Sequence, residues 1–251
     1  MKRVRSQPRP PHCRALVTGG SGEIGAAICQ ALADSGMIVI VHAGQRIERA
    51  QQIVAAINSN GGRSSCVQFD LTDGESTSTA MAKLIEDGPI SVVVHNSGVH
   101  DDAPMAGMSA SQWHHVIDVN LNGFYRAVQP TLLGMARVRW GRVIAISSVA
   151  ARMGNRGQTN YAAAKAGLHG GIISLAREMG GRGVTANVIA PGLIATRMAE
   201  HADLDNTLAL IPAGRLGLPG EVAALTSFLC SESAGYINGQ IIGIDGGMAP
   251  G

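Results

Sequence analysis

Three residues whose types and spacing suit proton transfer stand close together in the sequence. Tyr161 and Lys165 are four positions apart in NYAAAKAGL, and Ser148 follows the strand-like run RVIAIS 13 positions before Tyr161. On a helix, residues i and i+4 share one face with Cβ atoms about 5–6 Å apart, so the ammonium can favour the phenolate. A phenol whose pKa is lowered in this way can donate or accept a proton nearer neutral pH. An incidental pair on an alanine-rich helix is the alternative.

A glycine-rich run near the start of the chain has the residue types that a pyrophosphate site needs. In ALVTGGSGEIG a strand ends and a helix opens around Gly19, Gly20, Gly22 and Gly25. Glycines permit a tight turn and let backbone N–H groups approach an anion at the positive end of the helix dipole. The last three also satisfy G-x-G-x-x-G, which is informative only between a strand and a helix. The run therefore predicts a dinucleotide cofactor.

The ends of the next three strands supply further candidate cofactor contacts. Arg46 follows the second strand in a run without an acid, whereas an acid there would bind a ribose 2′-hydroxyl and repel a 2′-phosphate. This favours NADPH over NADH, and an arginine on a solvated helix face is the alternative. Asp70 can accept a hydrogen bond from an adenine amino group or cap the next helix. Asn96 and Gly98 follow the fourth strand, at the edge where ligands of such sheets bind.

Elements that could position these residues alternate along the whole chain, short β-rich runs with longer helical stretches. This pattern is typical of β-α-β units and a parallel sheet. The predicted strands are Ala15–Thr18, Ile38–His42, Ser65–Phe69, Ser91–His95, Arg142–Ser147, Val184–Ala190 and Gln240–Ile244. The predicted helices are Glu23–Ser35, Ile47–Asn60, Gly74–Glu86, Ser109–Arg137, Thr159–Gly180 and Gly220–Leu229. The irregular stretch Thr196–Gly217 is too long for an ordinary loop and predicts a lid, with an inert excursion as the alternative.

Length and composition favour one domain. The 251 residues are 45% hydrophobic but only 3% aromatic, and 33 are glycine, which suits helices laid closely on a sheet. We expect an α/β chain with a single doubly wound Rossmann domain over residues 14–251, a seven-stranded parallel sheet and a short lid region. Residues 1–13 are expected to form a disordered basic tail. The tail has no apolar run of the kind found in secretion signals, and no 18-residue apolar segment predicts a membrane span.

The charge distribution and the cysteines indicate which partners and which cellular compartment to expect. The net charge is +2, but basic residues crowd into the first 14 positions, so the remainder is slightly acidic and no nucleic-acid partner is expected. The four cysteines form no C-x-x-C pair, and no His or Cys stands at zinc-finger spacing, so no metal is expected. Such cysteines are typical of a reducing compartment, which predicts a cytoplasmic location.

From Arg14 to Met248 the chain resembles the short-chain dehydrogenase/reductase family. The matching pieces are TGGSGEIG, DLTD, HNSG, DVNLNGF, SSVAARMGNRGQTNYAAAK, NVIAPGLIATRM, PAGRLG and GYINGQIIGIDGGM. The middle block is most similar to 3-oxoacyl-acyl carrier protein reductases. The resemblance implies an NADPH-dependent homotetramer that reduces 3-oxoacyl groups on acyl carrier protein in fatty-acid or related polyketide or polyene synthesis. A reductase of small free ketones such as sugars or steroids, and a catalytically idle scaffold subunit, are the alternatives.

The resemblance also implies roles for individual residues. Ser148 would hold the substrate carbonyl, and Tyr161 would deliver its proton. Lys165 would bind the nicotinamide ribose and bias Tyr161 toward ionisation, while Asn120 would hold a water that connects Lys165 to solvent. A strand-end cap for Ser148 and a kink or buried hydrogen bond for Asn120 are the alternatives.

The resemblance implies cofactor contacts that follow several of the predicted strands. They are Gly19, Ser21, Gly22, Ile24, Gly25, Arg46, Asp70, Leu71, Asn96, Gly98, Tyr161, Lys165, Pro191, Gly192, Ile194 and Thr196. Arg139 and Arg182 fall where these reductases place docking arginines for the acidic carrier, although both could be ordinary solvated side chains. The chain departs from the family pattern at Glu23, where a glycine is usual, and in His95-Asn96-Ser97-Gly98, where Asn-Asn-Ala-Gly is common. Gly22 stands where NADPH-dependent members often have a basic residue.

Overall fold

The computed structural model describes residues 8–196 and 208–249. Within these ranges, seven parallel strands form one sheet in the order β3-β2-β1-β4-β5-β6-β7. The strands are β1 Arg14–Thr18, β2 Ile38–Ala43, β3 Arg63–Gln68, β4 Ile90–His95, β5 Gly141–Ile146, β6 Val184–Pro191 and β7 Ile241–Ile244. The predicted doubly wound α/β fold with a seven-stranded parallel sheet is therefore confirmed.

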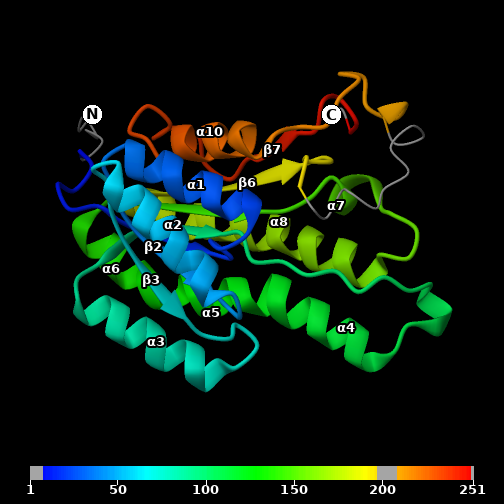
Figure 1. Ribbon diagram of the computed structural model, residues 1–251, viewed down its shortest axis with the longest axis horizontal. Coiled ribbons are helices and arrows are strands. Elements are labelled where there is room, and N and C mark those ends of the chain that lie inside the picture. The colour runs from blue at the N-terminus through cyan, green and yellow to red at the C-terminus, as the bar shows by residue number, and fades with distance from the viewer. Residues whose placement is uncertain (1–7, 197–207, 250–251) are drawn as a thin grey trace.

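Helices cover both faces of the sheet (Figure 1). One face carries α1 Glu23–Asp34, α2 Ile47–Ser59 and α10 Pro219–Leu229. The other carries α3 Gly74–Glu86, α4 Ala110–Ile117, α5 Gly123–Val128, α6 Leu132–Val138 and α8 Thr159–Met179. Ile28 and Leu32 of α1 pack with Val222 of α10 in one core, and Leu168 and Ile172 of α8 anchor the other. Because both faces are covered, the residues of β4, β5 and β6 are buried along the whole of each strand rather than at alternate positions.

The single long helix predicted over Ser109–Arg137 was wrong. The structure divides it into α4, a π-helical turn over Asp118–Asn122, α5, a 3-10 turn over Gln129–Thr131, and α6. Pro130 in the 3-10 turn lacks a backbone N–H and so interrupts the regular hydrogen-bond ladder. The π-turn contains Asn120 and matters for the site. A short helix, α7 Ala150–Met153, and the small turns Met105–Gly107 and Gly180–Arg182 were also not predicted.

The two predicted irregular segments fall partly outside the described residues. Residues 1–7 of the predicted tail and residues 197–207 of the predicted lid are not described. From Arg9 onward the predicted tail touches the domain, because the Arg9 backbone N–H donates to Glu232 (2.8 Å) and its guanidinium donates to the Ser35 carbonyl (2.9 Å). The disordered tail, the domain boundary and the lid stay predictions. None of the helices described is long and apolar enough to cross a membrane.

The strand order predicts a ligand site between β1 and β4. After β3 the chain crosses β1 to continue on its other side, so the connections after these two strands diverge. Ligands of doubly wound sheets bind outside the carboxyl ends of the strands at such a point. Thr18 and His95 are register partners there, each at the end of its strand.

Candidate active site

Three of the four predicted catalytic residues meet beyond the carboxyl end of β5. Ser148 follows that strand by two residues, and Tyr161 and Lys165 lie in the first two turns of α8. The Ser148 hydroxyl hydrogen-bonds the Tyr161 phenol. Lys165 is only 3% exposed, and its Nζ lies 5.7 Å from the centroid of the Tyr161 ring. The arrangement directs two hydroxyl groups and one amine toward a common region.

The expected lowering of the Tyr161 pKa is not found. Burial raises the pKa of this phenol, the hydrogen bond with Ser148 opposes the rise, and the Asp102 carboxylate adds to it. Lys165 is not among the groups that shift the pKa of Tyr161. Burial lowers the pKa of its own amine to about 7, and its Nζ donates to the Ile146 carbonyl (2.9 Å). Desolvation disfavours the charged form of both groups. In this structure the phenol is a proton donor at neutral pH, not a phenolate.

Asn120 lies in the π-turn with its side chain fully buried. Its Nδ2 donates to the carbonyl oxygens of Val99 and Val116 (2.8 Å each). Among the described residues its Oδ1 has no hydrogen-bond partner. A Cβ built on Gly98 would lie 2.8 Å from this Oδ1 and 3.0 Å from Lys165 Nζ, so both atoms border the space that Gly98 leaves open. The orphaned oxygen fits the predicted water-holding role, which stays a prediction.

The glycine-rich turn has the shape expected of a pyrophosphate cradle. Gly19 has a φ of +62°, and a Cβ there would lie 2.9 Å from the Ser97 Cα. A Cβ on Gly25 would overlap the Gly19 carbonyl oxygen, so a side chain at either position would displace the turn. Gly22 is the N-cap of α1 and provides no side-chain cap, which leaves that helix end to other partners. These features fit a nicotinamide dinucleotide, whose phosphates suit a helix N-terminus.

Asn96 and two buried histidines hold this turn in place. Asn96 Nδ2 donates to the Gly19 carbonyl (3.0 Å), and the Gly19 N–H donates to Nδ1 of His42 (3.1 Å). His95 contacts the Thr18 hydroxyl (3.1 Å) through Nδ1. Neither histidine was predicted to have a role. A polar ring at the end of an otherwise apolar strand was the signal that could have found them.

The structure separates the two roles considered for Asp70. The N-cap of α3 is Asp73, whose carboxylate accepts the N–H groups of Glu75 and Ser76 (3.0 Å each), so the alternative of a cap at Asp70 was wrong. The Asp70 carboxylate accepts from the backbone and the hydroxyl of Thr72 (2.8 Å each) and remains exposed. Its proposed contact with adenine stays a prediction. The neighbouring Leu71 is buried and packs on α5.

The remaining predicted cofactor contacts also lie at strand ends on this edge. Arg46 is exposed at the N-cap position of α2, after β2. Pro191 ends β6, and its carbonyl accepts the Val149 N–H (2.7 Å), which holds this segment beside Ser148. The other predicted contacts on these segments are Ser21 and Ile24 on the first turn of the α1 region, and Gly192, Ile194 and Thr196 after β6. The roles of all these residues stay predictions.

The two predicted docking arginines are neighbours, but they lie far from Tyr161. Arg139 ends α6 with a φ of +53°, and its guanidinium donates to the Gly181 carbonyl (3.0 Å), next to Arg182. Both precede strands, β5 and β6, and so lie at the amino edge of the sheet. Tyr161 and Arg182 are at opposite ends of the 21-residue helix α8, which spans about 30 Å. The two arginines and Tyr161 therefore lie at opposite edges of the sheet.

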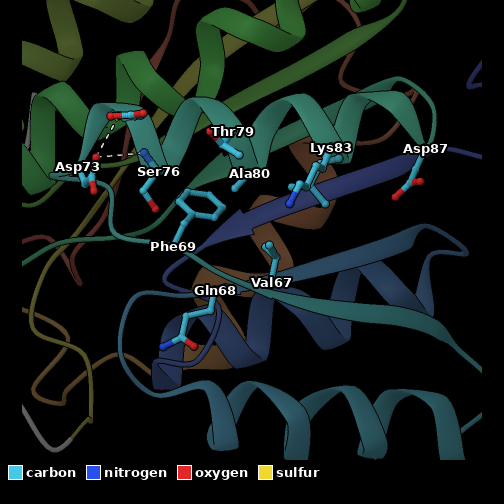
Figure 2. Close-up of a pocket in the computed structure, with 11 residues that line it drawn as sticks. Val67, Gln68, Phe69, Asp73, Ser76, Thr79, Ala80, Lys83 and Asp87 are labelled. Carbon is cyan, nitrogen blue, oxygen red and sulfur yellow. Dashed lines mark hydrogen bonds between the residues drawn. The ribbon is translucent and has the colours of Figure 1, made fainter.

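A hollow of about 520 Å³ lies between β3 and α3 (Figure 2), and none of the predicted catalytic residues lines it. Val67 and Phe69 line it from the strand side, and Ser76, Ala80 and Lys83 from the helix side. It contains no predicted site residue, and the hydroxyl pair at β5 remains the better candidate because its groups can exchange a proton. The described part of the chain holds no cluster of three or more His, Cys, Asp or Glu suited to a metal ion.

Comparison with known proteins places the chain in a family. A family model described as enoyl-(acyl carrier protein) reductase matches residues 20–249. The chain belongs to the short-chain dehydrogenase/reductase family, as its fold and its Ser148, Tyr161 and Lys165 arrangement also indicate. Members of this family use a nicotinamide cofactor.

Several relatives are similar over nearly their whole length. The 3-oxoacyl-(acyl-carrier-protein) reductase FabG of Pseudomonas aeruginosa is 40% identical over 93% of this chain and 96% of its own. The FabG protein of Escherichia coli strain K12 is 41% identical over 93% of this chain and 96% of its own. The acetoacetyl-CoA reductase of Cupriavidus necator is 39% identical over 93% of this chain and 97% of its own.

The two buried histidines predict a loss of stability in acid. Burial lowers the pKa of His42 to about 4 and that of His95 to about 3, below the value of ~6.5 for an exposed imidazole. As the pH falls, the unfolded chain therefore binds protons first, and the free energy of unfolding decreases from pH ~6.5 toward the folded-state values. We expect a loss of roughly 2 kcal/mol per histidine between pH ~7 and ~5 in urea unfolding.

The control for this prediction is the double variant His42→Gln with His95→Gln, which cannot titrate at these positions. It should lose clearly less of its own stability over the same pH interval. An equal loss in both proteins would show that other groups cause the acid sensitivity.

Proposed function

We propose that this chain is an NADPH-dependent reductase that converts a 3-oxoacyl thioester to the 3-hydroxyacyl thioester in fatty-acid or related polyketide or polyene synthesis. The observation that carries the proposal is the hydrogen-bonded pair of Ser148 and Tyr161 at the carboxyl end of β5. Two hydroxyl donors suit a ketone oxygen that gains negative charge in the transition state. The substrate class comes from the relatives named as 3-oxoacyl-(acyl-carrier-protein) reductases.

In this mechanism Ser148 orients the carbonyl and Tyr161 protonates it. When bound, the nicotinamide supplies the hydride for the carbonyl carbon. The Ser148 hydroxyl donates to the ketone oxygen, and the phenol gives that oxygen its proton. The raised pKa keeps the proton on Tyr161 until the developing alkoxide is basic enough to take it. The neutral phenol therefore suits the direction of reduction.

Lys165 and Asn120 would then return a proton to Tyr161. Lys165 Nζ and Asn120 Oδ1 border the same opening at Gly98, and a water there would connect the amine to the amide oxygen. With a pKa of about 7, the amine can lose and regain a proton near neutral pH. The contact between Lys165 and a nicotinamide ribose is proposed from the family resemblance.

The preference for NADPH is proposed from the end of β2. Arg46 is exposed there with Gly44 and Gln45, and no acid precedes it in this loop. An arginine beside the adenosine ribose can pair with a 2′-phosphate, whereas a carboxylate would repel it. The other cofactor contacts named above, from Gly19 to Thr196, belong to the same proposal.

The proposed partners are an acyl carrier protein and further copies of this chain. Tyr125 on α5 and Leu133 on α6 are 65% and 73% exposed, and such apolar side chains on one helical layer favour contact with a second copy. The distance from the docking arginines to Tyr161 makes a homotetramer relevant to catalysis, because a carrier docked on one copy could deliver its acyl group to the Tyr161 of another. A cytoplasmic location completes the proposal.

Steady-state assays should identify the substrate. We expect the highest kcat/KM with acetoacetyl-carrier protein, with acetoacetyl-CoA reduced less efficiently and the enoyl thioester crotonyl-CoA not reduced. The CoA thioester tests the alternative carrier that the Cupriavidus necator relative suggests, and the enoyl thioester tests the description of the family model. Reduction of free sugars or steroids alone would favour a small-ketone reductase. Binding of NADPH without any turnover would favour an idle subunit.

Replacing Tyr161 by Phe should reduce kcat at least about 1,000-fold and leave folding and NADPH binding intact, because one hydroxyl is removed at nearly constant volume. The matched control is Tyr236→Phe at a fully exposed tyrosine, which should keep wild-type kcat. Thermal unfolding and NADPH fluorescence titration would check the fold and the cofactor site. Near-normal ketone reduction by the Tyr161 variant would contradict the mechanism.

Replacing Arg46 by Ala should raise the KM for NADPH and leave that for NADH nearly unchanged. Loss of one arginine–phosphate pair is worth about 1.5–3 kcal/mol, so the preference should fall roughly tenfold or more. Arg49→Ala is the control, because Arg49 is exposed on the same helix and contacts Gln52. A wild-type preference for NADH, or an unchanged ratio of the two KM values in the Arg46 variant, would show that this arginine does not bind the 2′-phosphate.

Reversing the charge of Arg139 and Arg182 to Glu should raise the KM for the carrier-bound substrate through slower association, and added salt should shrink the difference. Reduction of a free thioester mimic should hardly change, because it lacks the carrier surface. Arg49→Glu with Arg63→Glu makes the same change in net charge on exposed residues elsewhere and is the control. Equal losses on both substrates would indicate a structural role for the arginines instead.

A further inference from the structure

Two buried histidines flank the end of β1. His42 lies in β2 and His95 ends β4, the two strands that pair with β1. They are 2% and 0% exposed. Buried polar rings need hydrogen-bond partners, and both nitrogens of each ring have one. The proton path proposed above uses neither ring.

The partners of His95 permit one protonation state. The Thr18 hydroxyl accepts the backbone N–H groups of Asn96 and Ser97, each at 3.1 Å. Its own proton is therefore left for Nδ1 of His95, 3.1 Å away. Nδ1 is then an acceptor, so Nε2 carries the ring proton and donates it to the Asn120 carbonyl (3.0 Å).

His42 is held in the same tautomer by different partners. Its Nδ1 accepts the Gly19 N–H (3.1 Å), so its Nε2 carries the proton and donates it to the Phe69 carbonyl (2.9 Å). Burial lowers the pKa of both rings. The nearby Lys165 lowers the pKa of His95 further, whereas at His42 the hydrogen bond with Phe69 and the nearby Asp70 only partly offset the effect of burial. Both rings are therefore neutral at physiological pH.

We propose that His42 and His95 are positioning residues, each held in the neutral Nε2–H tautomer, that fix the two halves of the candidate site. His42 holds the backbone of Gly19, where a cofactor pyrophosphate would meet the turn. His95 joins the end of β1 to the carbonyl of Asn120 in the π-turn. The Oδ1 of that asparagine shares the opening at Gly98 with Lys165. The inference rests on the proposed function and extends it to two residues outside the catalytic set.

The hydrogen bond between His42 and Gly19 should affect cofactor binding, whereas the hydrogen bond between His95 and Asn120 should affect proton transfer. Loss of the acceptor at His42 would release the Gly19 N–H and loosen the turn, with no direct effect on the π-turn. Loss of the donor at His95 would leave the Asn120 backbone carbonyl without this hydrogen bond. The side-chain amide of Asn120 could then move relative to Lys165. Each change removes one hydrogen bond to a buried group and leaves a polar atom unpaired, which is unfavourable.

NMR of the protein with ¹⁵N-labelled histidine tests the tautomers without any assay of activity. We expect two of the eight imidazoles to show a protonated Nε2 and an unprotonated Nδ1, with no titration between pH ~5 and ~8. The His42→Asn and His95→Gln variants assign the two sets of signals. A protonated Nδ1 at either residue, or titration in this interval, would overturn the proposal.

Kinetics of matched variants test the two roles. We expect His42→Phe to weaken NADPH binding about tenfold or more, measured by fluorescence titration. His95→Phe should instead lower kcat about tenfold or more and raise the solvent deuterium isotope effect on kcat, because proton return becomes slower. An asparagine oxygen can take the place of Nδ1 and a glutamine nitrogen that of Nε2. His42→Asn should therefore rescue NADPH binding, and His95→Gln should rescue kcat.

The results separate this inference from the proposed function. If both Phe variants lower only the melting temperature, or if they change NADPH binding and kcat in the same proportion, the histidines are structural and the inference fails. The Asn and Gln variants decide the outcome if the Phe variants do not fold, because loss of rescue also overturns it. Absence of wild-type turnover on any 3-oxoacyl thioester would overturn the proposed function, while the NMR and NADPH-binding results would still be measurable.

Discussion

The hydroxyl of Thr18 joins the two halves of the candidate site. It accepts the N–H groups of Asn96 and Ser97 at the end of β4 and directs its proton to His95. All these groups are at the carboxyl ends of adjacent parallel strands, where backbone donors would otherwise lack partners. The glycine-rich turn follows β1, and the segment that leads to Gly98 follows β4. The Thr18 side chain thereby fixes the positions of these two segments relative to each other. The relative position of these two segments therefore depends on the contacts of Thr18.

Burial has opposite consequences for the two groups that would move protons. It raises the pKa of Tyr161 and lowers that of Lys165 to about 7, so both groups are driven toward neutrality. A neutral phenol is a poorer base but retains the proton that reduction of a ketone consumes. An amine that titrates near neutral pH exchanges protons more readily than a permanently charged ammonium. The site therefore suits proton donation to an alkoxide better than deprotonation of an alcohol.

Much of the fold followed from local patterns, because the apolar runs and glycines that define strands and turns are local. The i, i+4 spacing of Tyr161 and Lys165 and the position of Ser148 after a strand likewise located the hydroxyl pair. Features that depend on tertiary contacts were missed. The π-turn at Asn120 falls within a predicted single helix, for which a kink at this residue was only an alternative. The pKa of Tyr161 was expected to be lowered but is raised, and His42 was not recognised. Both depend on groups distant in sequence.

The position of Arg139 and Arg182 links two proposals that the sequence alone treats as separate. Both arginines precede strands, so a parallel sheet places them at the edge opposite Ser148 and Tyr161, about 30 Å away along α8. A carrier that docks there must deliver its acyl group either over that span or to another copy. If two copies packed their α8 helices antiparallel, the end of one α8 would lie near the start of the other. Delivery to another copy would require an oligomer, whereas delivery within one chain would require the carrier's arm to span about 30 Å.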